Sequence, residues 1–140
     1  MQPSIPFSIV EIEPKSYHIL VNARIGDTPV KFIVDTGASR SVFDREFDSG
    51  IRIDGIDDSV AVGFMSDHVS IELALMPEFS IEGERFDSFP VALADLSSLR
   101  EFYANVTGLN IAGLLGCDFL VNNVTRINMR TRKFFLKKRV

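Results

Sequence analysis

Apolar side chains recur at every second position of residues 17–25, and a period of two indicates a half-buried β-strand rather than a helix. Leu20 alone breaks the alternation. Residues 26–29, Gly-Asp-Thr-Pro, supply turn chemistry, so residues 30–34 are expected to return as the second strand of a hairpin. That strand ends on two consecutive apolar residues before Asp35, which predicts that its last part is covered on both faces.

The rest of the chain continues in short segments of the same kind. Further strands are predicted at residues 59–64, 69–75, 79–81, 85–93, 124–129 and 134–138. Helix signals are few and short, at residues 44–48, at residues 96–104 behind a capping Asp95, and at residues 117–121. The length fits one domain, residues 1–140, in which residues 1–15 are a candidate extended N-terminal arm. The sum is an all-β fold, a closed barrel or a sandwich, with one or two short helices.

Composition excludes several classes of function. The chain has 15 basic and 19 acidic residues, and its net charge of −4 argues against a nucleic-acid partner. It has no apolar run of the roughly 18 residues that a membrane-spanning helix needs, and its first residues lack the pattern of a signal peptide. The single cysteine, Cys117, rules out an intrachain disulfide and suits a reducing compartment. We therefore expect a cytoplasmic protein without nucleic-acid or membrane partners.

The segment that carries chemistry runs from Asp35 to Ser39, Asp-Thr-Gly-Ala-Ser. An acid directly after a buried strand is costly unless it has hydrogen-bonding partners. Gly37 lets the backbone turn back and bring an N–H group to the carboxylate. Taken alone, the segment fits either a strand-ending turn, in which Asp35 bonds nearby N–H groups, or a catalytic carboxylate.

A second segment favours the catalytic interpretation. Residues 111–116, Ile-Ala-Gly-Leu-Leu-Gly, predict a buried strand that ends in glycine, and residues 117–120 begin a short helix. Together, the strings DTGASRSVFD and GLLGCDFL resemble the retroviral-like (retropepsin-like) aspartic proteases. The resemblance covers residues 19–136 and implies the closed β-barrel of a single acid-protease lobe.

The resemblance also implies roles for individual residues. Asp35 would be the catalytic acid, Thr36 would bond to its counterpart in a second molecule, and Gly37 would donate its backbone N–H group. The implied substrate-binding residues are Ala38, then Gly63, Phe64 and Met65 in a flap hairpin whose tip also holds Ser66, and finally Leu114, Leu115 and Gly116 beside the catalytic loop. The substrate would be an extended peptide that binds as an added strand, and no metal or organic cofactor would be needed.

A homodimer follows from the same resemblance. Aspartic proteases use two carboxylates that share a proton across a water, so that the ionised acid activates the water and the protonated acid donates to the scissile carbonyl. Two like charges about 3 Å apart cannot both ionise. This chain has one Asp-Thr-Gly, so the second Asp35 would come from a second copy related by a two-fold axis.

Ala38 adds one chemical expectation. In many relatives a serine or threonine follows the glycine and hydrogen-bonds the carboxylate, which favours the ionised form. Ala38 has no hydroxyl group, so we expect a pH optimum nearer neutrality.

Other side chains give weaker signals. His18 and His68 lie 50 residues apart and lack the spacing of a metal site. Cys117 is interpreted as a small buried residue, and Asp118 as the cap of the helix that starts there. Two other functions stay open at this point: a catalytically silent retropepsin-like module that binds or scaffolds peptides, and a purely structural β-barrel domain.

Overall fold

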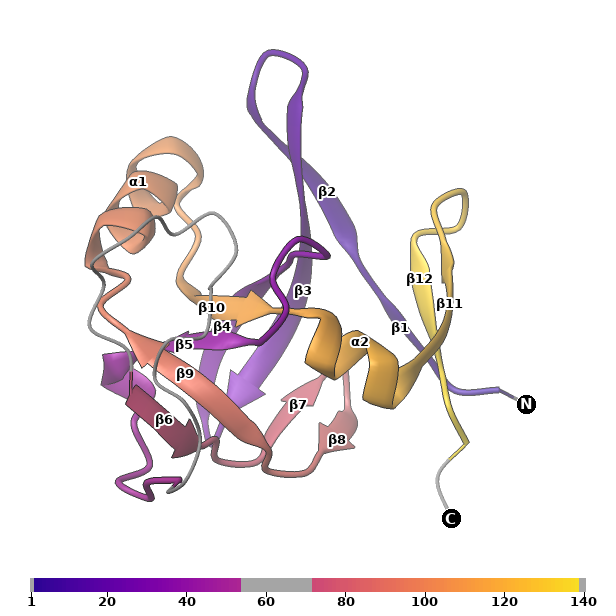
Figure 1. Cartoon of the computed structure of the whole chain (residues 1–140). Coiled ribbons are helices and arrows are strands. Elements are labelled where there is room, and N and C mark those ends of the chain that lie inside the picture. The colour runs from indigo at the N-terminus through magenta and orange to yellow at the C-terminus, as the bar shows by residue number, and fades with distance from the viewer. Residues whose placement is uncertain (1, 54–71, 139–140) are drawn as a thin grey trace.

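The computed structural model describes residues 2–53 and 72–138 (Figure 1). The strands, in chain order, are β1 Ser4–Pro6, β2 Ser8–Glu13, β3 Ser16–Ile25, β4 Thr28–Val34, β5 Val42–Asp44, β6 Glu72–Leu75, β7 Phe79–Ile81, β8 Glu84–Phe86, β9 Pro90–Ala94, β10 Ile111–Leu115, β11 Val124–Asn128 and β12 Lys133–Leu136. The helical elements are the 3₁₀ turn η1 Arg45–Phe47 and the helices α1 Ser97–Thr107 and α2 Cys117–Asn123.

The strands form one large curled sheet and one small sheet. The large sheet has the order β6-β9-β5-β10-β4-β3-β7-β8, with β2 paired to β3 beside this path. The small sheet has the order β1-β12-β11 and stands at one edge of the molecule (Figure 1). The predicted mostly-β lobe with one or two short helices is confirmed. The large sheet curls into a half-barrel, and within the described ranges the chain has two α-helices, α1 and α2.

The predicted hairpin of β3 and β4 is present, and it lies inside the large sheet between β10 and β7. Its register runs from Ile19 opposite Val34 to Ile25 opposite Thr28. The prediction that the end of β4 is covered on both faces is confirmed, because Phe32 and Val34 belong to one buried cluster and Ile33 belongs to another. Strand β10 lies parallel to β4 and antiparallel to β5, so it passes between the strands on either side of the Asp35 loop.

The first buried cluster is rich in phenylalanine. Phe79 contacts Phe32, Phe86 and Phe119, with ring centroids 5.4, 5.4 and 6.3 Å away. Such offset and edge-to-face pairs add to the free energy gained by burial alone. The second cluster includes Tyr103 of α1, whose side chain is fully buried.

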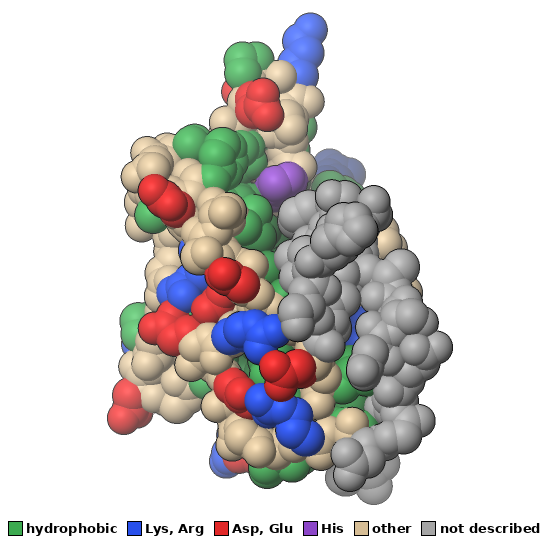
Figure 2. All heavy atoms as spheres, turned by 60° about the vertical axis from the view of Figure 1, so that its left-hand side comes forward, with side chains coloured by type: hydrophobic (Ala, Val, Ile, Leu, Met, Phe, Trp, Pro, Cys, Tyr) green, Lys and Arg blue, Asp and Glu red, His purple; other side chains and the backbone are tan. Residues whose placement is uncertain are grey.

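Helix α1 is held against the turn after β5 by a buried carboxylate. Asp44 accepts hydrogen bonds from the backbone N–H groups of Glu46 and Leu96, and from the guanidinium of Arg100 on α1. Near this turn, acidic and basic side chains alternate over the surface (Figure 2). Asp95 accepts from the N–H of Ser97, the first residue of α1, but the N-cap position is Leu96, so the predicted cap by Asp95 is wrong by one residue.

Two predicted elements differ from the structure. Residues 85–93 do not form one strand: β8 ends at Phe86, and β9 begins at Pro90 and pairs with β5 and β6. Proline lacks an N–H group and is tolerated as the first residue of a strand, which explains where the new strand starts. The helix predicted at residues 44–48 is a single 3₁₀ turn, η1.

Some predictions concern residues outside the described ranges. These are the strand at residues 59–64, the first three residues of the strand at 69–75, and the flap residues Gly63, Phe64, Met65 and Ser66. Residues 2–53 and 72–138 include no helix that is long and apolar enough to cross a membrane. The expected cytoplasmic location stays a prediction.

Candidate active site

Asp35 follows the last residue of β4 and is half-buried at the start of an exposed loop. Its backbone N–H donates to the carbonyl of Leu115 on β10, over 2.9 Å. The N–H of Gly37 donates to Asp35 Oδ1 over 2.8 Å, and the N–H of Ala38 donates to the Asp35 carbonyl over 3.2 Å. The carboxylate is therefore oriented by backbone groups, while Thr36 and Gly37 beside it are exposed.

Cys117, the first residue of α2, holds the loop at the residues after Asp35. The N–H of Cys117 donates to the Ala38 carbonyl over 2.8 Å. The thiol of Cys117 lies 3.1 Å from the Thr36 carbonyl and donates to it. Cys117 is half-buried, so it is not the fully buried small residue that the sequence suggested.

A buried link joins Ser41 to Asp118 of α2. Ser41 is fully buried, and its hydroxyl donates to Asp118 Oδ1 over 2.8 Å while it accepts from the N–H of Gly116 over 2.9 Å. The backbone N–H of Ser41 also donates to the Asp118 carboxylate. The interpretation of Asp118 as a helix cap is thus corrected: it lies in the first turn of α2, but its carboxylate mainly binds the loop that carries Asp35.

Gly116 allows this close approach. A Cβ atom there would lie 2.6 Å from the Ala38 carbonyl oxygen, closer than real contacts allow, and 3.0 Å from the Arg40 carbonyl carbon, which is a tight contact. Gly113, three residues earlier on β10, allows a second close approach, because a Cβ atom there would lie 2.3 Å from the Val42 carbonyl oxygen. The two glycines let β10 lie close to β5 and to the loop that joins β4 to β5.

The other expected site residues of β10 lie beneath the loop. Leu114 and Leu115 are buried in the two apolar clusters. Because both side chains are buried, neither is exposed to a substrate, and the recorded link to Asp35 is through the backbone carbonyl of Leu115. Ala38, with 1% of its surface exposed, is also buried. The flap residues cannot be placed relative to Asp35, because they lie outside the described ranges.

A hollow of about 250 Å³ borders Asp35 and Thr36. Its other lining residues come from β3, the end of β4, and the two strands of the β11–β12 hairpin: Tyr17, His18, Ile19, Ile33, Val34, Ile127 and Phe134. The hollow is mainly apolar and lies on the side of the loop that the small sheet flanks. The sequence did not indicate that β11 and β12 approach Asp35, because the contact joins segments about 90 residues apart along the chain.

His18, which lines the hollow, forms a polar pair with the buried Tyr103 of α1. The Nδ1 atom of His18 and the hydroxyl of Tyr103 are hydrogen-bonded, and their rings stack with centroids 5.7 Å apart. Burial raises the pKa of Tyr103 to about 12. Within residues 2–53 and 72–138, no three His, Cys, Asp or Glu side chains are grouped as a metal site would need.

Comparison with known families identifies the family of the chain. The family model "Aspartyl protease" matches residues 21–119, a span that includes the Asp35 loop and β10. The chain belongs to the aspartyl protease family. A search of curated protein sequences gave no match.

Solved structures resemble this chain at low sequence identity. A retropepsin-like aspartic protease from Rickettsia conorii is 17% identical with a TM-score of 0.51, over 97% of this chain and 90% of that one. The retroviral protease-like domain of Ddi1 from Leishmania major is 16% identical with a TM-score of 0.49, over 85% and 93% of the two chains. EIAV protease, in complex with the inhibitor HBY-793, is 18% identical with a TM-score of 0.39, over 84% and 86%. The retropepsin-like fold expected from the sequence is confirmed.

Proposed function

We propose that this protein is an aspartic endopeptidase that hydrolyses peptide bonds with a water held between the Asp35 carboxylates of two copies. The observation that carries the proposal is the geometry of the Asp35 loop. One oxygen of the carboxylate accepts the N–H of Gly37, and the acid is half-buried beside an exposed Thr36 at the surface of the protein.

The chemistry requires a second acid close to the first. Of two neighbouring carboxylates only one is ionised; it removes a proton from the water, while the protonated acid donates to the carbonyl oxygen of the scissile bond. Each chain contributes one Asp-Thr-Gly segment. A two-fold axis beside Asp35 would complete the site, with Thr36 of each copy in reach of the other.

The proposed substrate is an extended peptide. The loop and the hollow beside it are bordered by strand backbone and by apolar side chains such as Ile19 and Ile33. Such a surface suits recognition in which main-chain hydrogen bonds give affinity and apolar pockets select side chains. The catalytic, backbone-donor and supporting roles of Asp35, Thr36, Gly37, Ala38, Leu114, Leu115 and Gly116 are part of this proposal, and so are those of Gly63, Phe64 and Met65 in a flap.

The direct test is cleavage of a peptide library between pH 4 and pH 8 by the wild type and by Asp35→Asn. We expect cleavage by the wild type, with the optimum in the upper half of this range because Ala38 offers no hydroxyl to Asp35. Asp35→Asn should lose at least about a thousandfold in kcat/KM, since it removes the general base. Its mass in solution should equal that of the wild type.

Equal cleavage by both proteins would show that any activity belongs to another site, and the proposal would be wrong. A folded, dimeric wild type that cleaves no peptide of the library would instead support the alternative function, a silent peptide-binding module.

A further inference from the structure

The charges of this chain are divided unevenly along its length. Residues 1–118 hold all 19 acidic residues and 8 of the 15 basic ones, whereas residues 119–140 hold 7 basic residues and no acidic one. A block of one sign is often only a solvated surface, so its arrangement in the fold has to be considered. Most of this block lies in the small sheet, in strands β11 and β12 and in the turn that joins them.

The small sheet has one apolar face and one polar face. On β12, Phe134 and Leu136 are buried in the apolar core. Successive side chains of a strand point to opposite faces, so Lys133 and Phe135 lie on the other side. Arg126 of β11 pairs with Phe135, and paired residues share a face, so Arg126 lies there too.

The basic residues of this outer face form a row. Lys133, then Arg126 at the level of Phe135, then Lys137 follow one another along the direction of β12, two residues apart. Lys137 comes directly after β12 and stays hydrogen-bonded, because its N–H donates to the Asn123 carbonyl over 2.8 Å. Two residues of a strand span about 6.6–6.8 Å. The turn adds two exposed arginines, and these five residues form the basic face: Arg126, Arg130, Arg132, Lys133 and Lys137.

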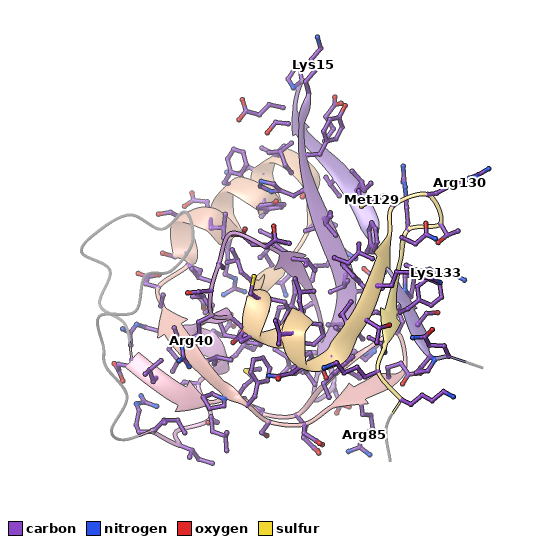
Figure 3. The ribbon with its side chains drawn as sticks, turned by 45° about the vertical axis from the view of Figure 1, so that its right-hand side comes forward. Lys15, Arg40, Arg85, Met129, Arg130 and Lys133 are labelled. Atoms are coloured by element: carbon purple, nitrogen blue, oxygen red, sulfur yellow. The ribbon has the colours of Figure 1, made fainter. Side chains whose placement is uncertain are left out.

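The basic face has no acidic partner among the residues that the structure describes. Within residues 2–53 and 72–138, no ion pair involves any of its five cations. Arg130 and Lys133 are exposed and point away from the rest of the protein (Figure 3). The turn itself is fixed, because the side chain of Asn128 accepts the N–H groups of Arg130 and Thr131, each over 3.0 Å. The cations are therefore accessible to a ligand on a backbone that hydrogen bonds hold.

Two of the cations are oriented by the protein itself. The Arg126 guanidinium lies 4.1 Å from the ring centroid of Phe135, and a guanidinium stacked on a ring keeps its N–H edge free for a carboxylate. The ammonium of Lys137 donates to the Val121 carbonyl over 2.8 Å, and it has two further N–H donors. Side chains that are oriented before binding lose less conformational entropy when a ligand arrives.

We propose that the basic face binds an extended acidic segment of another polypeptide, with carboxylates at every second residue. Such a segment carries its acids about 6.6–6.8 Å apart on one side, which matches the row of Lys133, Arg126 and Lys137. Arginine binds a carboxylate through two parallel N–H groups, so Arg130 and Arg132 extend the contact beyond the row. The basic face includes no residue of the Asp35 loop, so this inference does not depend on the proposed function.

Two other polyanions fit the basic face less well. Single-stranded nucleic acid is held by bases that stack on open aromatic rings, but the ring of Phe135 is already covered by Arg126. The acidic residues of the remaining chain would also repel a long phosphate backbone. An anionic membrane is bound by basic side chains together with apolar ones that insert, whereas the exposed Ile127 belongs to the opposite face, where it pairs with Phe134.

Peptide binding to the Asp35→Asn chain tests the inference without cleavage. The probes are three fluorescein-labelled octapeptides: Glu and Ser in alternation, a block of Glu followed by a block of Ser with the same charge, and Gln and Ser in alternation. Fluorescence anisotropy at low salt should show that the alternating acidic peptide binds at least about threefold more tightly than the block peptide. It should bind at least about tenfold more tightly than the neutral peptide.

Substitutions locate the binding on the protein. Arg126→Gln with Lys133→Gln should weaken binding of the alternating acidic peptide by at least about tenfold, because both charges of the row are lost. The matched control is Lys15→Gln with Arg24→Gln, which removes the same charge from exposed residues outside the basic face and should change the affinity by less than about twofold. Loss of Arg126 also removes the stack on Phe135. Arg130→Gln with Lys133→Gln, which leaves the stack intact, should therefore weaken binding as well, with an unchanged circular dichroism spectrum.

Several results would overturn the inference. Equal binding of the alternating and block peptides would show that the spacing of the row is not recognised. Equal affinities of the parent chain and of both basic-face variants would place the binding elsewhere. Tighter binding of a single-stranded oligonucleotide, or of vesicles that contain phosphatidylserine, would assign the basic face to that polyanion instead.

Discussion

At the scale of single residues, the Asp35 loop is built so that its polar atoms have fixed partners. The Asp35 N–H, the carboxylate oxygen Oδ1 and the carbonyls of Thr36 and Ala38 are each bonded to backbone or to Cys117. An acid held in this way does not need to reorganise before it reacts, which is the main means by which positioned groups lower a barrier. The hydrogen bond between Ser41 and Asp118 fixes the end of the same loop in the same way, although it does not touch Asp35.

The His18–Tyr103 pair gives a prediction on stability at high pH. Tyr103 is fully buried, and its pKa is raised from 10.0 to about 12. The unfolded chain therefore ionises this hydroxyl before the folded protein does. The stability that the neutral phenol contributes should be complete below pH 10 and should be lost as the pH rises from about 10 to about 12.

Tyr103→Phe should remove this dependence. At neutral pH the variant should lose about 1 kcal/mol of unfolding free energy, because the hydrogen bond to His18 is lost. Urea unfolding at pH 8, 10 and 11 measures both effects. A wild type and a Phe variant that lose stability in parallel above pH 10 would contradict this account of Tyr103.

At the scale of elements, the crossing of β10 between β4 and β5 determines where the acid lies. This crossing depends on glycine at two points where the backbones touch, Gly113 and Gly116. The sequence predicted β4, β10 and the Asp-Thr-Gly loop, because each has a local signature: alternation, an apolar run, or a turn residue. It did not predict the Ser41–Asp118 link, since local rules assign an acid at a helix start to capping and contain no information on a partner 77 residues away.

Substitutions of two glycines should separate stability from activity. Gly116→Ala should cost about 2–3 kcal/mol of unfolding free energy, because its Cβ atom would meet backbone atoms of Ala38 and Arg40 that cannot move independently. Gly37→Ala is the matched change in the exposed part of the loop, where the added Cβ atom meets only the Asp35 carboxylate, at 3.2 Å.

Gly37→Ala should change the unfolding free energy by less than about 1 kcal/mol and lower kcat/KM by at least about tenfold. Thermal unfolding and peptide cleavage on the same samples measure both quantities. If Gly116→Ala were as stable as the wild type, the close approach of β10 to the loop would not be essential to the fold.

At the scale of the whole molecule, the sequence predicted the class of fold but not how the chain ends are used. The short alternating strands predicted a mostly β fold, and the resemblance of the two quoted motifs to retropepsin-like proteases implied their lobe. The pairing of β1 with β12 was not predicted, because β1 has three residues and ends in proline, which is too short for an alternation of apolar and polar side chains to be recognised. The domain limits, the N-terminal arm and the flap stay predictions. The dimer stays one too, and every chemical role assigned to Asp35 depends on it.

The measurement that tests this claim most directly is peptide cleavage by mixtures of wild type and Asp35→Asn at constant total concentration, with subunit exchange verified by native mass spectrometry. If each active site needs an Asp35 from both copies, activity should follow the square of the wild-type fraction, so that an equal mixture keeps about a quarter of the activity. An equal mixture of fully exchanged subunits that keeps about half of the activity would show that each chain acts alone, and would contradict the account.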